Sequence, residues 1–278
     1  MSDEIVFPKD PIIVIKDGKT YIQNLKIMTA QNFYKDNKII KVDPMPPIGW
    51  FASEKYDGIR AIWNGKQFVS RGSTSGLPKV YSYVPDFILN IMPMGVALDG
   101  EIWLARNKFS EVSGLSNIKP GGKYKKEDID NKWKLIKYKI FDIPNSEMIF
   151  EDRIKLLESI INERKKLWSE NFNFPLEIVN HHKITSEEEV YKLFNDLTLE
   201  GAEGIMLRAP NSKYEQKRSK YLLKFKIQDD AEAVVKNYSL GTGKYKDKLG
   251  ALVCALILKG KETNILFNIG TGLTDEHR

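Results

Sequence analysis

The stretch FASEKYDGIR, residues 51–60, sets the interpretation of the whole chain. It places Lys55 after an acid and before a Tyr-Asp-Gly turn, and it closes on Arg60. A protonated lysine is a poor nucleophile, so its pKa of roughly 10.4 must fall, through nearby cations or burial, before the amine can attack phosphorus. Because Lys-Tyr-Asp-Gly alone is more typical of an exposed turn, a nucleophilic Lys55 needs support from the rest of the chain.

The composition is that of an ordinary soluble globular protein. The 278 residues are 42% hydrophobic and 29% charged, which allows one large domain or two smaller ones. There is no apolar signal segment, and no stretch approaches the roughly 18 apolar residues of a membrane span, so we expect a cytoplasmic protein without a membrane partner. Cys254 is the only cysteine, which excludes a disulfide framework and a cysteine-rich zinc module.

Basic residues are unevenly distributed. The formal net charge is +6, and residues 213–248 hold ten Lys and Arg against five Asp and Glu. Such a surplus can be a solvated surface, but it also attracts polyanions through Coulomb steering and counterion release. Composition therefore makes nucleic acid a plausible partner and no more than that.

The stretch LDGEIWL, residues 98–104, reads as a strand with a polar face. Strand alternation places Asp99, Glu101 and Trp103 on one side and aliphatic residues on the other. Two carboxylates on one face suit a hard cation such as Mg²⁺ or a sugar hydroxyl, although a polar outer face on an edge strand would look the same.

Two later strands also carry charge. EGIMLR, residues 203–208, has Glu203 at the entrance to an apolar run. In YLLKFKI, residues 221–227, strand alternation puts Lys224 and Lys226 on one face and the apolar residues on the other. Amphipathic strands with outward lysines are common, so each feature is weak evidence in isolation.

Three segments follow from the pattern of turns. Residues 1–44 form an N-terminal extension with a β-hairpin signalled by Asp17-Gly18, and residues 45–228 form the main domain. In residues 229–278, short β runs separated by glycine turns are typical of a small antiparallel barrel.

Two helices are expected to serve as scaffold. Residues 151–168 show apolar residues at helical spacing, and residues 185–197 open with Thr185 and Glu188 in a capping-box pattern. The Gly-, Pro- and Lys-rich residues 116–132 predict an exposed loop.

Six short motifs occur along the chain in a telling order: KYDGIR, SRG, DGE, the aromatic of YKIFDIP, EGIMLR and KFK. In this order they resemble the motifs of the covalent nucleotidyltransferases, which comprise ATP-dependent DNA ligases, RNA ligases and mRNA capping guanylyltransferases. KYDGIR, LDGEIWLARNKFSEVSGL and EGIMLR look most like the small ATP-dependent DNA ligases of viral and bacteriophage type. GTGKYKDKLGALVCAL and FNIGTGLTDEHR resemble the start of the OB-fold of these ligases. The resemblance covers residues 45–278.

The resemblance implies a fold and a reaction. The fold would be α+β, with an ATP-grasp-like adenylation (nucleotidyltransferase) domain followed by a partial β-barrel, an OB-fold. Small DNA ligases continue past the stretch that FNIGTGLTDEHR resembles, so residues 229–278 are expected to be an OB-fold incomplete at its C-terminal end. The reaction would seal nicks between a 3′-hydroxyl and a 5′-phosphate in DNA repair or replication, with ATP and Mg²⁺ or another divalent cation as cofactors.

The resemblance also assigns the residues that handle phosphate. Lys55 would form the lysyl-AMP phosphoramidate, and Arg60 would contact the nucleotide sugar. Arg71 would contact a phosphate, either that of AMP or the 5′-phosphate of the nick. Lys224 and Lys226 would grip the α-phosphate. These roles suit cationic side chains.

The remaining assignments concern metal, sugar and base. Glu101 would bind the ribose or a metal, Glu203 would serve the metal, and Phe141 would stack on adenine. Glu54 is assigned to nucleotide binding with less support, because the family often has a glutamate two residues before the lysine, where Ser53 stands here.

Two alternatives stay open. An RNA ligase or a capping-type guanylyltransferase would share the Lys55 chemistry, whereas a non-catalytic DNA-binding relic would share the charge but not the covalent adduct. NAD-dependent ligases carry a cysteine zinc module, which a chain with one cysteine cannot form. We expect a monomer that acts on nicked duplex DNA.

Overall fold

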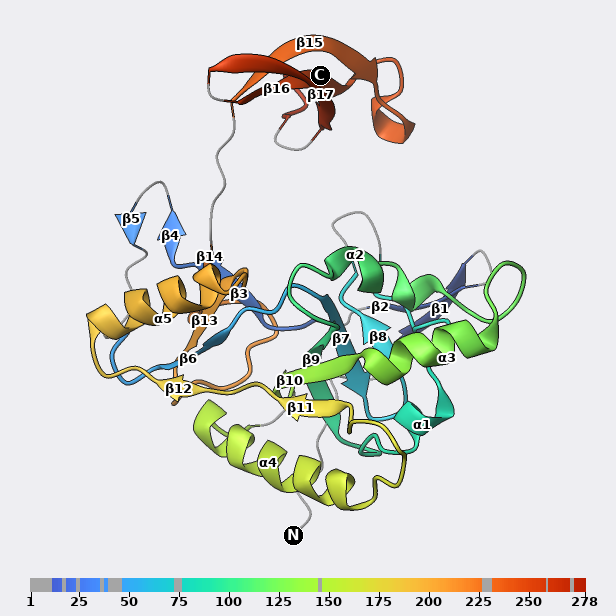
Figure 1. Ribbon diagram of the computed structural model, residues 1–278, viewed down its shortest axis with the longest axis vertical. Coiled ribbons are helices and arrows are strands. Elements are labelled where there is room, and N and C mark those ends of the chain that lie inside the picture. Colours follow the sequence, from blue (N-terminus) through green and yellow to red (C-terminus); the bar gives the residue numbers. More distant parts are fainter. Residues whose placement is uncertain are drawn as a thin grey trace. The chain divides into compact units, whose positions relative to one another are not determined.

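Two five-stranded sheets dominate the larger part of the chain (Figure 1). The computed structural model describes residues 12–16, 19–23, 26–35, 38–39, 47–72, 77–144, 147–226, 232–258, 260–270 and 273–278. The first sheet contains, in spatial order, β11 (Leu176–Ile178), β10 (Lys137–Asp142), β9 (Ala97–Trp103), β7 (Ile59–Asn64) and β8 (Phe68–Ser70). The second contains β12 (His182–Lys183), β6 (Phe51–Glu54), β13 (Gly204–Arg208), β14 (Arg218–Lys226) and β3 (Thr29–Asn32). All neighbours are antiparallel except β10 with β11 and β14 with β3.

One face of the first sheet is covered by helices and forms the larger hydrophobic core. Leu98 and Ile102 of β9 are fully buried in it, as strand alternation predicted. The helices of this part are α1 (Asp86–Leu89), α2 (Phe109–Val112), α3 (Lys126–Leu135) and α4 (Phe150–Lys166), together with the 3₁₀ turn η1 (Leu115–Asn117). The predicted loop over 116–132 is wrong from residue 126, because Ile129 and Trp133 lie one turn apart on α3 and insert into this core.

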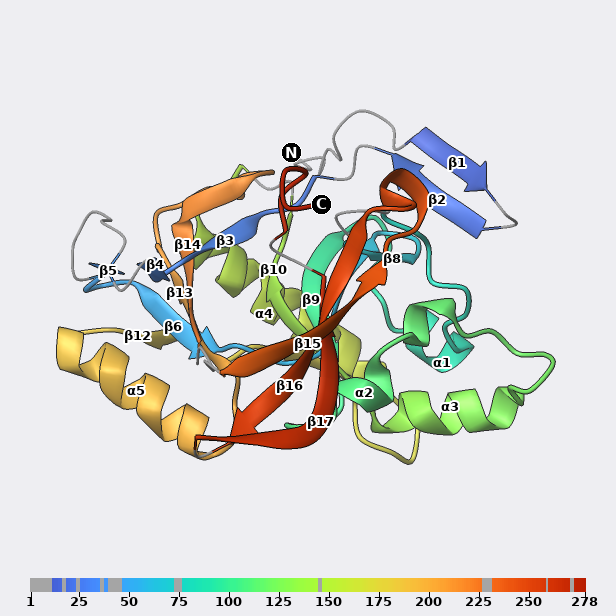
Figure 2. The same cartoon turned by 90° about the horizontal axis from the view of Figure 1, so that it is seen from above.

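The second sheet packs on helix α5 (Glu187–Leu199). Figures 1 and 2 both show α5 beside this sheet, with α3 at the opposite end of the same unit. The predicted cap of α5 is displaced by one residue: the Ser186 hydroxyl accepts a hydrogen bond from the Glu189 amide at 3.3 Å, and the Glu189 carboxylate accepts one from the Thr185 amide at 2.6 Å. The first bond is that of a capping box with Ser186 as the N-cap, whereas the returning bond comes from Thr185, the residue before the N-cap.

The N-terminal segment supplies more than a hairpin. Strands β1 (Ile12–Lys16) and β2 (Lys19–Gln23) pair as predicted, and the Asp17-Gly18 turn lies outside the described residues. Strands β4 (Tyr34–Lys35) and β5 (Lys38–Ile39) form a second small pair. Between these pairs, β3 joins the second sheet beside β14, so residues 29–32 are built into the main domain that the sequence placed after residue 44.

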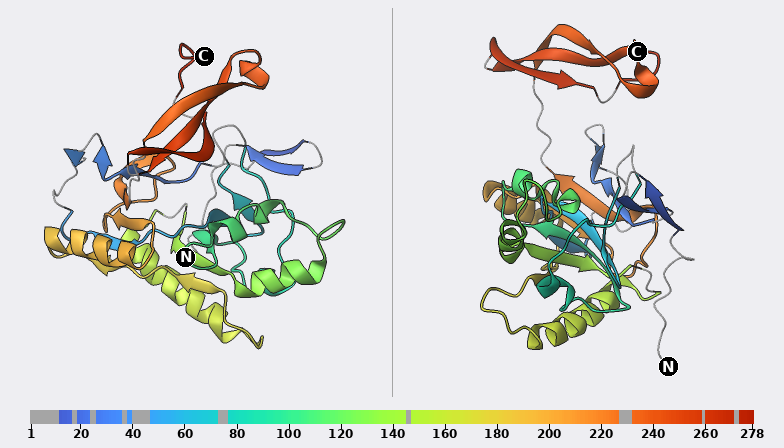
Figure 3. Two further views of the ribbon diagram at one scale, coloured as in Figure 1. Left: turned by 45° about the horizontal axis from the view of Figure 1, so that its top comes forward. Right: turned by 90° about the vertical axis from the view of Figure 1, so that its right-hand side faces the viewer.

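The chain divides into two compact units, Met1–Ile227 and Gln228–Arg278. In the second unit, β15 (Ala233–Leu240), β16 (Leu249–Leu258) and β17 (Lys261–Ile269) form a twisted antiparallel sheet, with the 3₁₀ turn η2 (Gly243–Tyr245) after β15 (Figure 3). Among its described residues, 232–258, 260–270 and 273–278, no closed barrel is present. The mixed α and β composition is therefore confirmed, and the OB-fold is not.

Candidate active site

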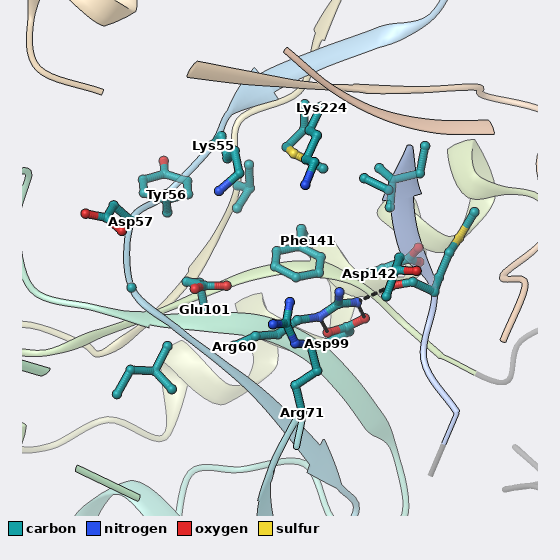
Figure 4. Close-up of a pocket in the computed structure, with 18 of the residues that line it drawn as sticks. Lys55, Tyr56, Asp57, Arg60, Arg71, Asp99, Glu101, Phe141, Asp142 and Lys224 are labelled. Carbon is teal, nitrogen blue, oxygen red and sulfur yellow. Dashed lines mark hydrogen bonds and ion pairs between the residues drawn. The ribbon is translucent and has the colours of Figure 1, made fainter. Parts of the chain in front are cut away.

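Residues from both five-stranded sheets line one cavity of about 920 Å³ in the first unit. Ser53, Met206 and Lys224 face it from neighbouring strands of the second sheet, as the pairing of Met206 with both others requires. The first sheet contributes residues of β7, β9 and β10 from the other side (Figure 4): Arg60, Asp99, Glu101, Phe141 and Asp142. The cavity thus collects most of the residues predicted to act.

Lys55 lies in the turn that leads from β6 to β7, where the chain passes from one sheet to the other. Its amide donates to the carbonyl of Gly204 at 2.9 Å, which prolongs the pairing of β6 with β13. Its amine forms an ion pair with Glu203. The turn also explains a glycine of the motif: a Cβ on Gly58 would lie 2.3 Å from the carbonyl oxygen of Ile102, so the chain can enter β7 only without a side chain there.

Further cations surround Lys55. Figure 4 shows the amines of Lys55 and Lys224 pointing into the cavity toward Phe141 and Glu101. Burial, together with the charges of Lys226 and Lys55, lowers the pKa of Lys224 below its ordinary value. The amine of Lys226 lies 3.6 Å from the Glu203 carboxylate, and Arg71 is exposed at the cavity wall after β8.

Arg60 is held by a buried carboxylate. Its Nε and a terminal nitrogen donate to the two oxygens of Asp99 at 2.9 and 2.6 Å, and the same terminal nitrogen donates to the carbonyl of Met28 at 2.7 Å. The Tyr214 hydroxyl also donates to Asp99, at 2.6 Å. Burial disfavours the guanidinium charge, but Asp99 more than compensates and raises the pKa of Arg60 above its ordinary value. Arg60 is thus fixed beneath the Phe141 ring, 5.3 Å from its centroid.

Glu101 and Phe141 lie on adjacent strands and face the same space (Figure 4). Burial raises the pKa of Glu101 to about 7, although the nearby charges of Arg60 and Lys55 oppose the rise. A carboxylate poised between its two protonation states responds strongly to any cation or hydroxyl that enters the cavity.

The Glu54 carboxylate is bound by Arg106. It accepts two hydrogen bonds, each at 3.0 Å, and the Glu54 side chain is 14% exposed. Glu54 and the buried Ser53 both line the cavity. The nucleotide-binding role predicted for Glu54 stays a prediction.

The cavity wall contains a buried charge cluster that the sequence did not predict. Asp142 accepts two hydrogen bonds from Arg153, at 2.6 and 3.0 Å, and one from Arg208 at 3.0 Å. His181, beside this cluster, is half-buried, and burial lowers its pKa to about 4. Arg208 is the last residue of the EGIMLR motif and Asp142 lies in YKIFDIP, but nothing in the sequence linked the two.

No preformed metal centre accompanies these residues. Within the described part of the chain, no group of three or more His, Cys, Asp or Glu side chains could hold a metal ion. Glu101 and Glu203, the predicted metal-binding residues, both line the cavity. None of the described helices is long and apolar enough to cross a membrane.

Comparison with known proteins identifies the family. The family model for the ATP dependent DNA ligase domain matches residues 28–226. The chain therefore belongs to the ATP-dependent DNA ligases, which confirms the family and the enzyme class predicted from the motif order. The match begins at Met28, just before β3, in agreement with the place of that strand in the second sheet.

Individual relatives agree with the family. The DNA ligase of Haemophilus influenzae is 30% identical over 233 residues, covering 84% of this chain and 76% of that protein. DNA ligase 1 of Methanosarcina mazei is 29% identical over 246 residues, covering 81% of this chain and 42% of that protein. The chain thus spans less than half of the archaeal relative.

Solved structures show the same fold. A Lig E DNA ligase, studied for DNA binding with a minimal scaffold, has a TM-score of 0.67 and 26% identity over 91% of this chain and 86% of its own. The Chlorella virus DNA ligase–adenylate has a TM-score of 0.53 and 21% identity over 91% of this chain and 84% of its own, a likeness of fold alone.

Proposed function

We propose that this ligase seals 3′-hydroxyl/5′-phosphate nicks in duplex DNA through an AMP adduct on Lys55. The observation that carries the proposal is the cavity itself: the Lys55 amine, paired with Glu203, shares it with Lys224, Arg71, Glu101 and the Phe141 ring. Cations beside a lysine favour both its loss of a proton and the approach of a phosphate.

The first step joins AMP to the enzyme. Lys55 loses a proton, for which the carboxylate of Glu203 is the adjacent acceptor. The free amine forms an N–P bond to the α-phosphorus of ATP while the bond from that phosphorus to the bridging oxygen breaks, and pyrophosphate leaves. Lys224 stabilises the extra negative charge on the α-phosphate, the kind of preorganised electrostatic contribution that dominates phosphoryl transfer.

Two further transfers use the same phosphate-binding cations. An oxygen of the 5′-phosphate at the nick attacks the phosphorus of the adduct, the P–N bond breaks, and Lys55 recovers its amine. The 3′-hydroxyl then attacks the 5′-phosphate phosphorus, its proton is lost, and AMP leaves with the bond electrons. Arg71, exposed at the cavity wall, would hold the 5′-phosphate through charge-assisted hydrogen bonds.

The residues present fit both nucleotide and metal. A cavity of about 920 Å³ lies within the usual size range of cofactor sites, and it offers an aromatic face for adenine and cations for phosphate. Glu101 and Glu203 would hold Mg²⁺, which usually takes one or two carboxylates from a protein and completes its shell with substrate phosphates and water. When bound, Mg²⁺ neutralises phosphate charge.

The second unit is proposed to be part of an OB-fold that contacts DNA, and the enzyme a cytoplasmic monomer. Support for the OB-fold comes from its antiparallel strands and glycine turns. The excess of basic residues within 213–248 lies in residues 213–226 of the first unit, which would also contact DNA. Basic side chains on the phosphodiester backbone carry no sequence information, so the enzyme would recognise a nick by shape.

Labelling with α-³²P-ATP, followed by denaturing electrophoresis, tests the first step. The wild-type chain should retain the label and Lys55→Ala should not, and label that survives the substitution would exclude Lys55. Wild-type activity of Glu101→Ala and Glu203→Ala across a magnesium titration would remove these carboxylates from the metal site. Matched nicked DNA and RNA duplexes, and GTP in place of ATP, separate DNA ligation from RNA ligation and guanylyl transfer.

A further inference from the structure

One guanidinium outside the cavity joins three elements of the fold. Arg106 lies in the turn after β9 and donates to both oxygens of Glu54, each at 3.0 Å. Its remaining nitrogen donates to the Glu200 carboxylate at 2.8 Å and to the Glu200 carbonyl at 3.2 Å. Glu54 ends β6, and Glu200 is the C-cap of α5. Arg106 therefore ties the end of a strand of the first sheet to two elements on the side of the second.

Each of the two carboxylates lies shortly before one member of the proposed reacting pair, Lys55 and Glu203, in the sequence. Glu54 is followed by Lys55, and Glu200 precedes by three residues Glu203, the ion-pair partner of Lys55. The two segments are also bound to each other, because the Lys55 amide donates to the Gly204 carbonyl at 2.9 Å. A shift of either segment would therefore move the Lys55 amine relative to the cavity.

The backbone around Arg106 is tightly specified. Asn107 adopts a left-handed conformation, with a φ of 61°, and Gly201 does the same after α5, with a φ of 89°. The side-chain nitrogen of Asn107 lies 3.2 Å from the place that a Cβ on Gly201 would occupy. The turn that carries Arg106 and the end of α5 thus approach closely.

The two contacts differ in exposure. The Glu54 side chain is 14% exposed and that of Glu200 is 65% exposed, while that of Arg106 is 28% exposed. Surface ion pairs contribute little, whereas shielded bidentate pairs fix geometry. The contact with Glu54, the residue next to the nucleophile, should carry most of the effect.

We propose that Arg106 is a positioning residue for Lys55, which holds β6 and the segment before Glu203 in the arrangement that presents the Lys55 amine to the α-phosphate. The role rests on the proposed function. Arg106 is not among the described residues that line the cavity, so it acts through its neighbours. Lys55 reacts when AMP enters the enzyme, but it is not a reacting group when an already adenylylated nick is closed.

This difference gives a sharp test. In single-turnover assays, Arg106→Gln should slow formation of the AMP adduct at saturating ATP by about 10- to 100-fold, the cost of a misplaced reacting group, with little change in the KM for ATP. Closure of a synthetic adenylylated nick should keep its rate. Arg106→Lys keeps the charge but cannot span both carboxylate oxygens, so it should rescue only part of the loss.

Three further variants complete the design. Glu54→Gln should reproduce much of the defect of Arg106→Gln, and Glu200→Gln should have a smaller effect. The control is Lys137→Gln, which removes a partly exposed ion pair with Glu177, 3.1 Å long, from the first sheet. It should leave both rates unchanged.

The outcomes separate the two proposals. If Arg106→Gln slows adduct formation and nick closure equally, Arg106 only stabilises the fold. If adduct formation is unchanged, Arg106 has no role in the reaction. Either result overturns the inference. If Arg106→Gln does not fold, Glu54→Gln decides the matter by the same two rates. A wild-type chain that forms no adduct would instead overturn the proposed function, and with it the role of Arg106.

Discussion

His181→Phe should remove a defined part of the pH dependence of stability. The His181 ring packs edge-on against Phe150 at 5.1 Å, a contact that phenylalanine can keep. Burial lowers the pKa of His181 from 6.5 to about 4; the charge of Asp142 opposes this shift and that of Arg208 adds to it. Between these pH values the unfolded chain binds more protons than the folded one, so stability falls as the pH falls.

The size of the effect follows from the shift. Each pKa unit corresponds to about 1.4 kcal/mol, so His181 should cost the folded state about 3 kcal/mol between pH 6.5 and pH 4. The contribution is fully present above pH 6.5 and is lost by pH 4. His181→Phe should therefore lose about 3 kcal/mol less than the wild type over this interval, because the carboxylates that titrate in the same range are common to both chains.

Tryptophan fluorescence can isolate the relevant unit. All five tryptophans of the chain belong to Met1–Ile227, so urea unfolding followed by their emission reports on that unit alone: Trp50, Trp63, Trp103, Trp133 and Trp168. Ile161→Val, a buried change that alters no titrating group, serves as control and should lower stability by about 1 kcal/mol at every pH. Parallel stability curves for the wild type and His181→Phe would refute the reasoning.

Three other changes test the site and its support. Arg71→Ala should slow sealing of a 5′-phosphorylated nick by about tenfold or more, the usual effect of losing a charge-assisted contact, and unchanged sealing kinetics would remove Arg71 from the site. Gly204→Ala should cost about 2–4 kcal/mol in urea unfolding, since φ is +149° and the new Cβ would lie 2.2 Å from a carbonyl of β14; wild-type stability would contradict that geometry. Asp142→Asn leaves the Arg153 and Arg208 guanidiniums buried with no carboxylate and should cost about 3–5 kcal/mol by the same method, and a loss below about 1 kcal/mol would show that the charges are solvated.

Strand alternation carried much of the prediction. It put Asp99, Glu101 and Trp103 on one face of β9 and gave the opposite face to the core, which the structure confirms. It also separated Lys224 from the buried Leu223. Both inferences succeed because the two-residue period of a strand is local and needs no knowledge of its neighbours.

Segments without a regular spacing of apolar residues were predicted less well. The glycines and lysines before α3 suggested a loop through residue 132, whereas burial of Ile129 and Trp133 stabilises a helix whose exposed face is charged. Tertiary packing overrides local composition in this way. Likewise, only the fold makes His181 part of a cavity wall and leaves His182, its neighbour in the sequence, exposed.

The support of the site could not be predicted for a more general reason. Lys55 and Glu203 are 148 residues apart, and Arg106 reaches Glu54 and Glu200 across 52 and 94 residues. In a strand that borders a cavity, alternate residues face the substrate, and those between them must face the scaffold. Glu54 borders the cavity and directly precedes the proposed nucleophile, and its carboxylate is bound by Arg106. A charged residue next to a motif residue on a strand is therefore better interpreted as one partner of a structural ion pair than as a displaced member of the motif. Its ion-pair partner has to be sought on the elements that the fold packs against that strand.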